Sequence, residues 1–169
     1  MEIWDLYDRQ RHVIGEHIRG RELPENGYHL VVHVWVRSSG GKYLMSRRSR
    51  NKSSYPLLWE CVGGSAFKGE DSISAAVRET KEETGLNFAK ENGELLFTFI
   101  RDTVGGKRIN DIVDVWLFRY DGDIPLGKAT TDEVEEAKWM SKDEISALRD
   151  EGQLVTSIKD LGYFFEMMD

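Results

Sequence analysis

The sequence predicts a single α+β domain in which helices cover the faces of a mixed β-sheet. The chain has 169 residues, of which 40% are hydrophobic, and this is enough for one compact domain with a sizeable core. Runs typical of strands and of helices are mixed without a regular β-α-β alternation, which favours a mixed sheet over a fully parallel one. No linker rich in Pro, Gly or Ser divides the chain, so we expect residues 1–169 to form one domain.

The first third of the chain is expected to be mainly β-structure. Its four β-rich runs are residues 3–7, 13–18, 29–37 and 42–47. The first two predict an N-terminal hairpin within residues 1–20, and the turn-like Ser38-Ser39-Gly40-Gly41 joins the second two. An irregular segment, residues 48–59, then leads to Gly63 and Gly64.

The remainder of the chain alternates helices with strands. A helix is expected from about Asp71 to Thr84, because Asp71 or Ser72 can cap its start and Gly85 suits the left-handed conformation that often ends a helix. Further strands are predicted at residues 95–103, 109–120 and 135–140. Ser141 and Glu144 form a capping box that opens a second helix, and a third helix is expected over residues 155–167.

The composition excludes several classes of protein. The formal net charge is -7, so a general attraction to nucleic-acid polymers is not expected. Cys61 is the single cysteine and cannot form an intramolecular disulfide. The N-terminus has no secretion-signal pattern, and the longest apolar stretch, Leu30 to Val36, is too short to span a bilayer. We therefore expect a cytoplasmic location without a membrane partner.

Three carboxylates crowd one arc of the helix that ends at Thr84. At about 100° per residue, one stripe of side chains should face the sheet: Ile73, Ala76, Val77, Thr80 and Thr84. Glu79 and Glu83 lie one turn apart beside this stripe, and Glu82 lies further round on the same arc. No lysine one turn away offsets their repulsion. The arc is either a solvated acidic face or a site for a hard divalent cation.

The segment before this helix favours the cation site. Gly63 to Glu70 is a glycine-rich loop, but it is not a Walker loop, because Glu70 stands where the phosphate-binding lysine is needed. The loop and helix match the Nudix box over residues 64–86, and the chain thus resembles the Nudix hydrolase family. The matching residues are Gly64, Glu70, Arg78, Glu79, Glu82, Glu83, Gly85 and Leu86. Thr80 departs from the pattern, which prefers a bulky aliphatic residue there.

The resemblance implies a fold, a cofactor and a set of site residues. The fold is an α/β/α sandwich with a central mixed sheet. The cofactor is Mg²⁺ or Mn²⁺, and its implied ligands are Glu79, Glu82, Glu83 and a backbone carbonyl of the glycine loop, assigned to Gly64. The implied catalytic group is Glu83, Glu82, Arg78 and Glu70, in which Arg78 is structural and pairs with Glu70 to orient the carboxylates.

The resemblance also implies a reaction. Mg²⁺ or Mn²⁺ neutralises a small-molecule diphosphate of nucleoside diphosphate type and activates a water that attacks one phosphorus. A further carboxylate serves as general base or extra ligand. The candidates are Glu83 itself and the acidic run of Asp132, Glu133, Glu135 and Glu136. Within this run, we predict that Glu133 or Glu136 is the extra carboxylate. The alternative for that run is a solvated loop.

Basic and aromatic residues before the glycine loop are candidates for substrate contacts. Residues 26–59 contain six basic residues and no Asp or Glu. Arg47, Arg48 and Lys52 are predicted to contact phosphate, although a solvated strand end is the ordinary alternative. Five aromatics either stack on a substrate ring or pack in the core: Tyr28, Trp35, Tyr55, Trp59 and Trp116. His29 and His33 share one strand face and are weaker candidates for metal ligands.

Two alternative functions, an isomerase and a nucleotide sensor, and a possible homodimer are also considered. The chain is loosely similar to the isopentenyl-diphosphate isomerase branch of the Nudix fold at residues 28–31 and around Trp59. Cys61 lies two residues, or about 7 Å, from the position of the isomerase cysteine, so we interpret it as a small buried hydrophobe. Nucleotide-sensing Nudix domains typically lack box carboxylates, and none is missing here. The N-terminal hairpin is a candidate homodimer contact.

Overall fold

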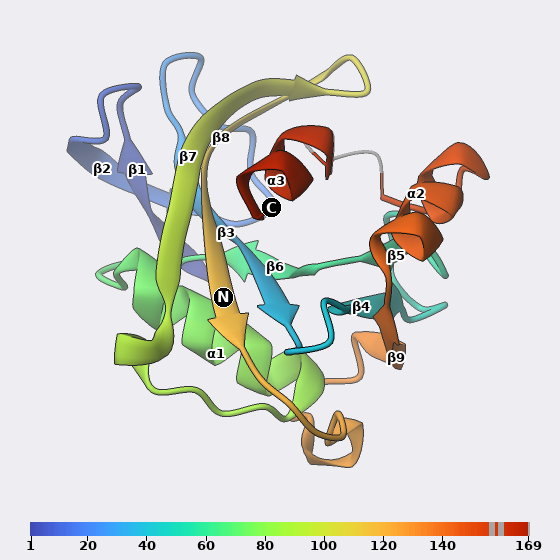
Figure 1. Ribbon diagram of the computed structural model, residues 1–169. Helices are drawn as coiled ribbons and strands as arrows, with labels where there is room; N and C mark the ends of the chain where they lie inside the picture. The colour runs from blue at the N-terminus through green and yellow to red at the C-terminus, as the bar shows by residue number, and fades with distance from the viewer. Residues whose placement is uncertain (156–157, 159–160, 169) are drawn as a thin grey trace.

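The computed structural model of the chain describes residues 1–155, 158 and 161–168 (Figure 1). The N-terminal hairpin consists of β1 (Ile3–Tyr7) and β2 (Val13–Ile18), which pair antiparallel. This confirms the hairpin predicted within residues 1–20. An antiparallel bridge between Tyr7 and Tyr28 joins the hairpin to the chain that enters the main sheet.

The main sheet of the described residues has seven strands and is mixed. They are β3 (His29–Arg37), β4 (Tyr43–Arg48), β5 (Trp59–Glu60), β6 (Val62–Ser65), β7 (Glu94–Val104), β8 (Lys107–Arg119) and β9 (Val134–Met140). The order is β5-β4-β3-β8-β7, with β6 paired to β3 and β9 paired to β4. β3 and β8 run parallel, whereas β3 and β6 run antiparallel. The predicted α+β class with a central mixed sheet is confirmed.

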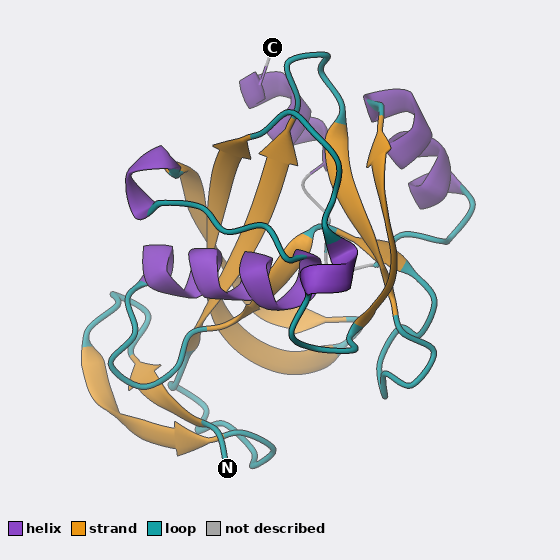
Figure 2. Cartoon of the chain, turned by 90° about the horizontal axis from the view of Figure 1, so that it is seen from below, coloured by secondary structure: helices purple, strands orange, loops and turns teal. Residues whose placement is uncertain are grey.

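Helices cover both faces of this sheet. They are α1 (Ser72–Thr84), α2 (Lys142–Asp150) and α3 (Leu161–Met168), with short 3-10 turns η1 (Lys90–Asn92) and η2 (Leu126–Lys128). Figures 1 and 2 show α1 crossing one face of the sheet, while α3 lies on the other. Among the described residues, none of the helices combines the length and apolarity that crossing a bilayer requires.

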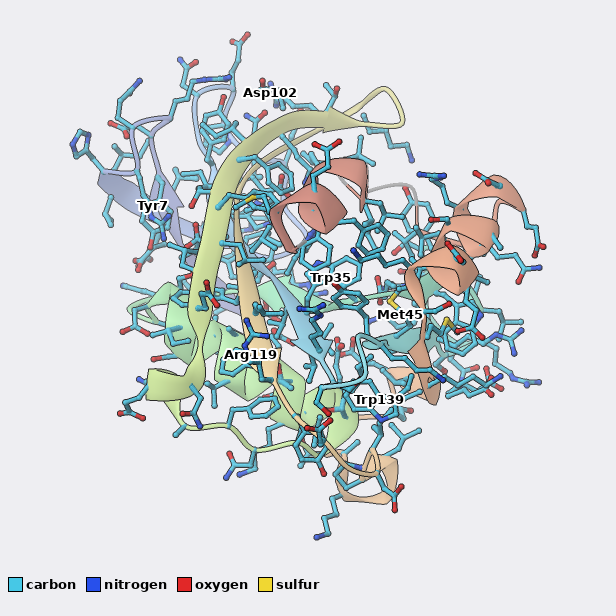
Figure 3. All side chains as sticks on the ribbon, viewed as in Figure 1. Tyr7, Trp35, Met45, Asp102, Arg119 and Trp139 are labelled. Carbon is cyan, nitrogen blue, oxygen red and sulfur yellow. The ribbon has the colours of Figure 1, made fainter. Side chains whose placement is uncertain are left out.

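The alternation of side chains along β3 divides the core into two clusters. Val32 and Val34 point to the α1 side, where they pack with Ala75 and Ala76. Their neighbours Val31 and Trp35 point to the opposite side, where Trp35 stacks on Phe164 of α3 at a centroid distance of 4.3 Å. Figure 3 shows Trp35 beneath α3. Because successive side chains of a strand point to opposite faces, β3 alone contributes side chains to both apolar layers.

The predicted helix caps are present. The Asp71 side chain accepts a hydrogen bond from the Ser74 N–H at 2.9 Å. Gly85 ends α1 with a φ of 80° and donates its N–H to the Lys81 carbonyl. Ser141 and Glu144 form the expected capping box at the start of α2. These local signals fix where the two helices begin and where α1 ends.

The third helix is shorter than predicted. We expected it over residues 155–167, but α3 begins at Leu161. Residues 153–155 are held alongside β5, because Trp59 donates its N–H to the Gln153 carbonyl at 2.8 Å and accepts from the Val155 N–H at 2.9 Å. These backbone groups are therefore used in strand-like pairing and not in a helix. The predicted helical residues 156–157 and 159–160 lie outside the described residues.

Candidate active site

Strand β6 places the glycine loop against the carboxylates of α1. In the antiparallel β3–β6 pair, Val32 lies opposite Gly64 and His33 lies opposite Gly63. The chain then passes through residues 66–71 into α1. A Cβ atom added to Gly64 would lie only 2.2 Å from Oε1 of Glu79. Only glycine therefore lets the Glu79 carboxylate pack directly on this strand.

Arg78 braces the loop against the helix. Its Nε and Nη2 donate to the two carboxylate oxygens of Glu70 at 2.8 and 2.9 Å, so the predicted Arg78–Glu70 pair is present. Nη2 also donates to the Ser65 carbonyl at 3.0 Å. The guanidinium lies over the Phe67 ring, 3.8 Å from its centroid. A bidentate pair, a carbonyl contact and a cation–π contact together fix the loop's path.

Arg78 also holds two of the three carboxylates of α1. Its Nη1 donates to Glu79 at 2.8 Å and to Glu82 at 3.1 Å. The sequence shows no lysine that offsets the repulsion on this arc; in the structure an arginine does so. The Arg78 side chain is long enough to contact both the next residue, Glu79, and Glu82, which lies one helical turn further on.

The carboxylates of Glu79 and Glu83 are withdrawn from solvent. The Glu79 side chain is 14% exposed and Glu83 is 5% exposed. Burial raises the pKa of Glu79 to about 7, although the charge of Arg78 opposes this rise. The alternative of a solvated acidic face is therefore wrong for these two residues. The structure also places Glu83 among the buried residues of α1. The helical periodicity had predicted that only the stripe from Ile73 to Thr84 would face the sheet.

Glu83 holds the least compensated polar atom of the site. Its Oε2 is buried and has no hydrogen-bond partner among the described residues. Burial raises the pKa of Glu83 well above its usual range, and the charges of Glu60, Glu79 and Glu133 raise it further. Buried carboxylate oxygens normally have a partner. An unpaired oxygen beside other carboxylates is the environment that a cation stabilises.

The donor set on α1 fits a hard divalent cation. In the chain as far as it is described, no three or more His, Cys, Asp or Glu side chains converge closely enough to form a metal cluster. Glu79 and Glu82 are turned towards Arg78. The oxygen chemistry nevertheless suits Mg²⁺ or Mn²⁺, because the unpaired Oε2 of Glu83 and the contact of Glu79 with Gly64 supply carboxylates beside a backbone strand.

The loop before β9 contacts the C-terminal end of α1. The carbonyl of Glu82 accepts hydrogen bonds from the Thr130 and Thr131 N–H groups at 2.9 and 3.2 Å. In the acidic run that follows, the charge of Glu133 raises the pKa of both Glu79 and Glu83. The loop thus brings Glu133 into the electrostatic environment of the box carboxylates.

Two further members of the acidic run, Glu135 and Glu136, also have cationic partners. Glu135 pairs with Arg50, whose hydrogen bonds lower the pKa of that carboxyl. Glu136 lies 3.0 Å from Lys138 and 3.8 Å from Arg47. Neither charge is among the main causes of the raised pKa of Glu79 or of Glu83. Glu133 is therefore the better supported of our two candidates for an extra carboxylate.

The three predicted phosphate contacts have protein partners. Arg47 donates from Nε to the Leu57 carbonyl at 3.1 Å, in addition to its contact with Glu136. Lys52 pairs with Glu133, and its charge partly offsets the raised pKa of Glu83. The sequence pattern correctly indicated basic residues near this site. It did not show that Glu133 before β9, Glu136 on β9 and Glu60 on β5 pair with them.

Glu60 is a site residue that sequence reasoning missed. It lies on β5 and pairs with Arg48 at 2.6 Å, with both side chains less than 20% exposed. Burial raises the pKa of Glu60 against the effect of Arg48. The Glu60 charge in turn raises the pKa of Glu83. Its position directly before the glycine loop, as the first acidic residue after a long basic window, was the available signal.

A small cavity lies beside the glycine loop. It has a volume of about 150 Å³, and its lining includes His33, Glu60, Cys61, Gly63 and Gly64. Burial and the charge of Arg101 lower the pKa of His33 to about 3, so His33 is neutral. Cys61 is 3% exposed, and burial raises its thiol pKa, which confirms the interpretation of a small buried hydrophobe.

The two histidines of β3 do not share a site. His29 stacks on Trp4 with centroids 4.4 Å apart, whereas His33 faces Phe99. Four of the five aromatics considered as stacking partners pack into the core: Tyr28, Trp35, Trp59 and, more peripherally, Trp116. Tyr55 is 36% exposed and lines a separate pocket.

Comparison with known proteins gives consistent matches. Residues 27–160 match the family model described as NUDIX domain. An uncharacterized Nudix hydrolase of Listeria innocua is 32% identical over 167 residues, which cover 98% of this chain and 91% of that protein. A crystal structure from Deinococcus radiodurans is similar with a TM-score of 0.74, 22% identity and 96% coverage of both chains.

A third match is to part of a larger protein. It is a bifunctional NMN adenylyltransferase/ADP ribose pyrophosphatase of Francisella tularensis, crystallised with AMP and a manganese ion. The TM-score is 0.63 and the identity 21%, and the match covers 89% of this chain and 42% of that chain. At this level of identity, the comparison concerns the fold alone.

Proposed function

The chain belongs to the Nudix hydrolase family, and from this premise we propose that it hydrolyses the diphosphate linkage of a small nucleoside diphosphate-type substrate. Nudix hydrolases typically use divalent metal ions, and we propose Mg²⁺ or Mn²⁺ here. The observation that carries the proposal is the buried, unpartnered Oε2 of Glu83, beside a Glu79 that packs directly on Gly64.

The proposed metal ligands are Glu79, Glu82, Glu83 and the carbonyl of Gly64. Bound there, the ion supplies positive charge against the diphosphate and lowers the pKa of a water molecule. Arg78 is a positioning residue, because its contacts to Glu70 and Ser65 fix the orientation in which it presents Glu79 and Glu82. Burial disfavours its charge, but its carboxylate partners outweigh this and raise the pKa of Arg78 above its usual range, so it stays charged.

One carboxylate must accept the proton of the attacking water. Glu83 and Glu133 are the two candidates. Glu83 carries the buried, unpaired Oε2, and the charge of Glu133 on the opposite loop helps to raise the pKa of Glu83. The pair of Glu133 with Lys52 suggests how the substrate enters, because its phosphates can replace the carboxylate as partners of Lys52.

Arg47 and Arg48 are proposed to bind the substrate in the same way. Arg48 donates to Glu60 at 2.6 Å, and Arg47 lies 3.8 Å from Glu136. Each guanidinium is therefore already oriented by a carboxylate. A phosphate that displaces the carboxylate finds an arginine whose side chain is partly ordered in advance.

A substrate panel with controlled metal content tests this proposal. The protein is offered nucleoside diphosphate derivatives and isopentenyl diphosphate with Mg²⁺, with Mn²⁺ and with a chelator. We expect release of phosphate or a nucleoside monophosphate that depends on the metal. Rearrangement to dimethylallyl diphosphate would overturn the proposal in favour of an isomerase. Ligand-induced thermal stabilisation without turnover would overturn it in favour of a nucleotide sensor.

A further inference from the structure

A second and much larger pocket lies between the N-terminal hairpin and the β7–β8 hairpin. Its volume is about 1000 Å³, and residues 53–55 close a third side. Figure 1 shows β1 and β2 beside the long arch of β7 and β8. The aromatic part of the lining consists of Trp4, His29 and Tyr55. This pocket does not include the box carboxylates.

Cationic side chains outnumber carboxylates in this pocket, although the whole chain is acidic. The lining has four cations, Arg21, Arg101, Lys107 and Arg108, against two carboxylates, Glu22 and Asp111. Arg101 pairs with Asp111 at 2.6 Å, and Arg108 pairs with Glu22 at 3.1 Å. Arg21 and Lys107 have no carboxylate partner in the described part of the chain. The lining thus has an excess of two positive charges.

A second observation points to a ligand in the same place. The Nδ1 atom of His29 is buried and has no hydrogen-bond partner among the described residues. The ring is fixed by stacking on Trp4 with an interplanar angle of 12°. A rigid, unpartnered polar atom in the lining of a pocket with an excess of positive charge is suited to a polar, negatively charged group.

The pocket is connected to the proposed catalytic site in two ways. His29 and His33 lie on the same face of β3, and His33 is opposite Gly63. Four residues at about 3.3 Å each place His29 roughly 13 Å from the glycine loop along the strand. In addition, the Ser54 carbonyl accepts a hydrogen bond from Arg48, whose other partner is Glu60. The pocket and the Arg48–Glu60 pair thus share the segment of residues 53–55.

We propose that this pocket binds a phosphate monoester carried by the substrate in addition to its diphosphate. The proposal rests on the proposed hydrolase function and names the substrate class: a nucleoside diphosphate derivative phosphorylated a second time on the nucleoside half. A monoester carries close to two negative charges at neutral pH, which matches the excess of two cations. The net charge of -7 disfavours a nucleic-acid polymer as the occupant.

Two matched ligand pairs test the proposal. NADPH differs from NADH, and coenzyme A from dephospho-coenzyme A, by one phosphate monoester. Dissociation constants are measured with the wild-type protein in chelator, so that the ligand is not consumed. We expect the phosphorylated member of at least one pair to bind about tenfold tighter or more, the scale of one charge-assisted contact. The two pairs distinguish a dinucleotide from a coenzyme A type of substrate.

Variants of the pocket assign the effect to the proposed residues. The double substitution Arg21→Gln with Lys107→Gln should remove the preference for the phosphorylated member. Arg119→Gln is the matched control, because Arg119 is an exposed arginine at the end of β8 remote from the β7–β8 turn (Figure 3). It should leave the preference unchanged.

The outcomes separate this proposal from the proposed function. Equal binding within both pairs, or no binding of any of the four ligands, would overturn the phosphate site. A preference that survives the double substitution would also overturn it. Tighter binding of a phosphorylated member without hydrolysis by the wild-type protein would support the pocket and contradict the hydrolase.

Discussion

At the scale of single residues, Glu83 is the side chain on which the proposed chemistry depends most. Its carboxylate is buried, and its Oε2 has no hydrogen-bond partner among the described residues. We predict that Glu83→Gln keeps the fold but lowers turnover by about a hundredfold or more, because the amide can neither bind the cation as an anion nor accept a proton. Steady-state kinetics and circular dichroism of the two proteins measure both effects.

The control for this prediction is Glu91→Gln, which changes an exposed glutamate in η1 and should leave turnover unchanged. A Glu83→Gln protein that is folded and as active as the wild type would remove Glu83 from the mechanism.

Glu79 gives the metal-free protein a characteristic pH dependence. Its pKa is about 7 in the folded chain, against an ordinary value of 4.5. Between these values the folded state binds more protons than the unfolded state, so the free energy of unfolding falls as the pH rises. The loss is at most about 3 kcal/mol. Urea unfolding in chelator at about pH 5 and pH 8 should show it in the wild type and show less in Glu79→Gln.

Added Mg²⁺ should recover stability above pH 7, because the cation favours the ionised carboxylate. Identical pH profiles for the wild type and Glu79→Gln would contradict this assignment of the pKa.

At the scale of elements, the close contact of β6 with α1 positions the site. A methyl group at Gly64 would overlap the Glu79 carboxylate, which can move away because it ends a flexible side chain. We therefore predict that Gly64→Ala lowers turnover at least about tenfold while destabilising the fold by only about 1 kcal/mol. Turnover and thermal unfolding are measured together. Gly127→Ala is the matched control, because no atom lies within 4 Å of its added Cβ.

If Gly64→Ala retains full activity, the position of Glu79 on the glycine strand is not required. If instead it unfolds the protein, the backbone of β6 and not the Glu79 side chain is the sensitive element.

One ion pair between the N-terminal hairpin and the sheet uses a buried carboxylate. Arg11 donates to both carboxylate oxygens of Asp114 at 2.8 and 2.6 Å, and the Asp114 side chain is 1% exposed. Arg11→Gln should cost about 2 kcal/mol, which is below the range for fully buried pairs because Arg11 reaches solvent. Urea denaturation measures this. Arg9→Gln, which breaks the exposed pair with Asp102, should have a much smaller effect; equal losses would contradict the role of burial.

At the scale of the whole molecule, local sequence signals predicted the elements well and their long-range partners poorly. The caps at Asp71, Gly85 and Ser141 are contacts within a few residues, so the sequence contains them completely. The predicted start of α3 was wrong because residues 153–155 are paired with Trp59, nearly a hundred positions away in the chain. Pairings of that kind depend on topology, which periodicity does not show.

The same division applies to the candidate site. The spacing of Arg78, Glu79, Glu82 and Glu83 belongs to one helix, so the residue pattern alone is enough to identify the box. The pairing of Lys52 with Glu133 and of Arg48 with Glu60 requires β4, β5 and the loop before β9 to meet. The phosphate pocket likewise combines three segments that are distant in sequence. Substrate selection is therefore a property of the assembled molecule and not of the motif.

The central claim is that water attacks a phosphorus atom in a reaction that requires a divalent cation. The most direct test is hydrolysis of an accepted diphosphate substrate in ¹⁸O-labelled water with Mg²⁺ or Mn²⁺, followed by mass spectrometry of the products. We predict one labelled oxygen in one phosphate-containing product, and no cleavage in chelator. Label in a product other than a phosphate, or cleavage that continues unchanged in chelator, would contradict the claim.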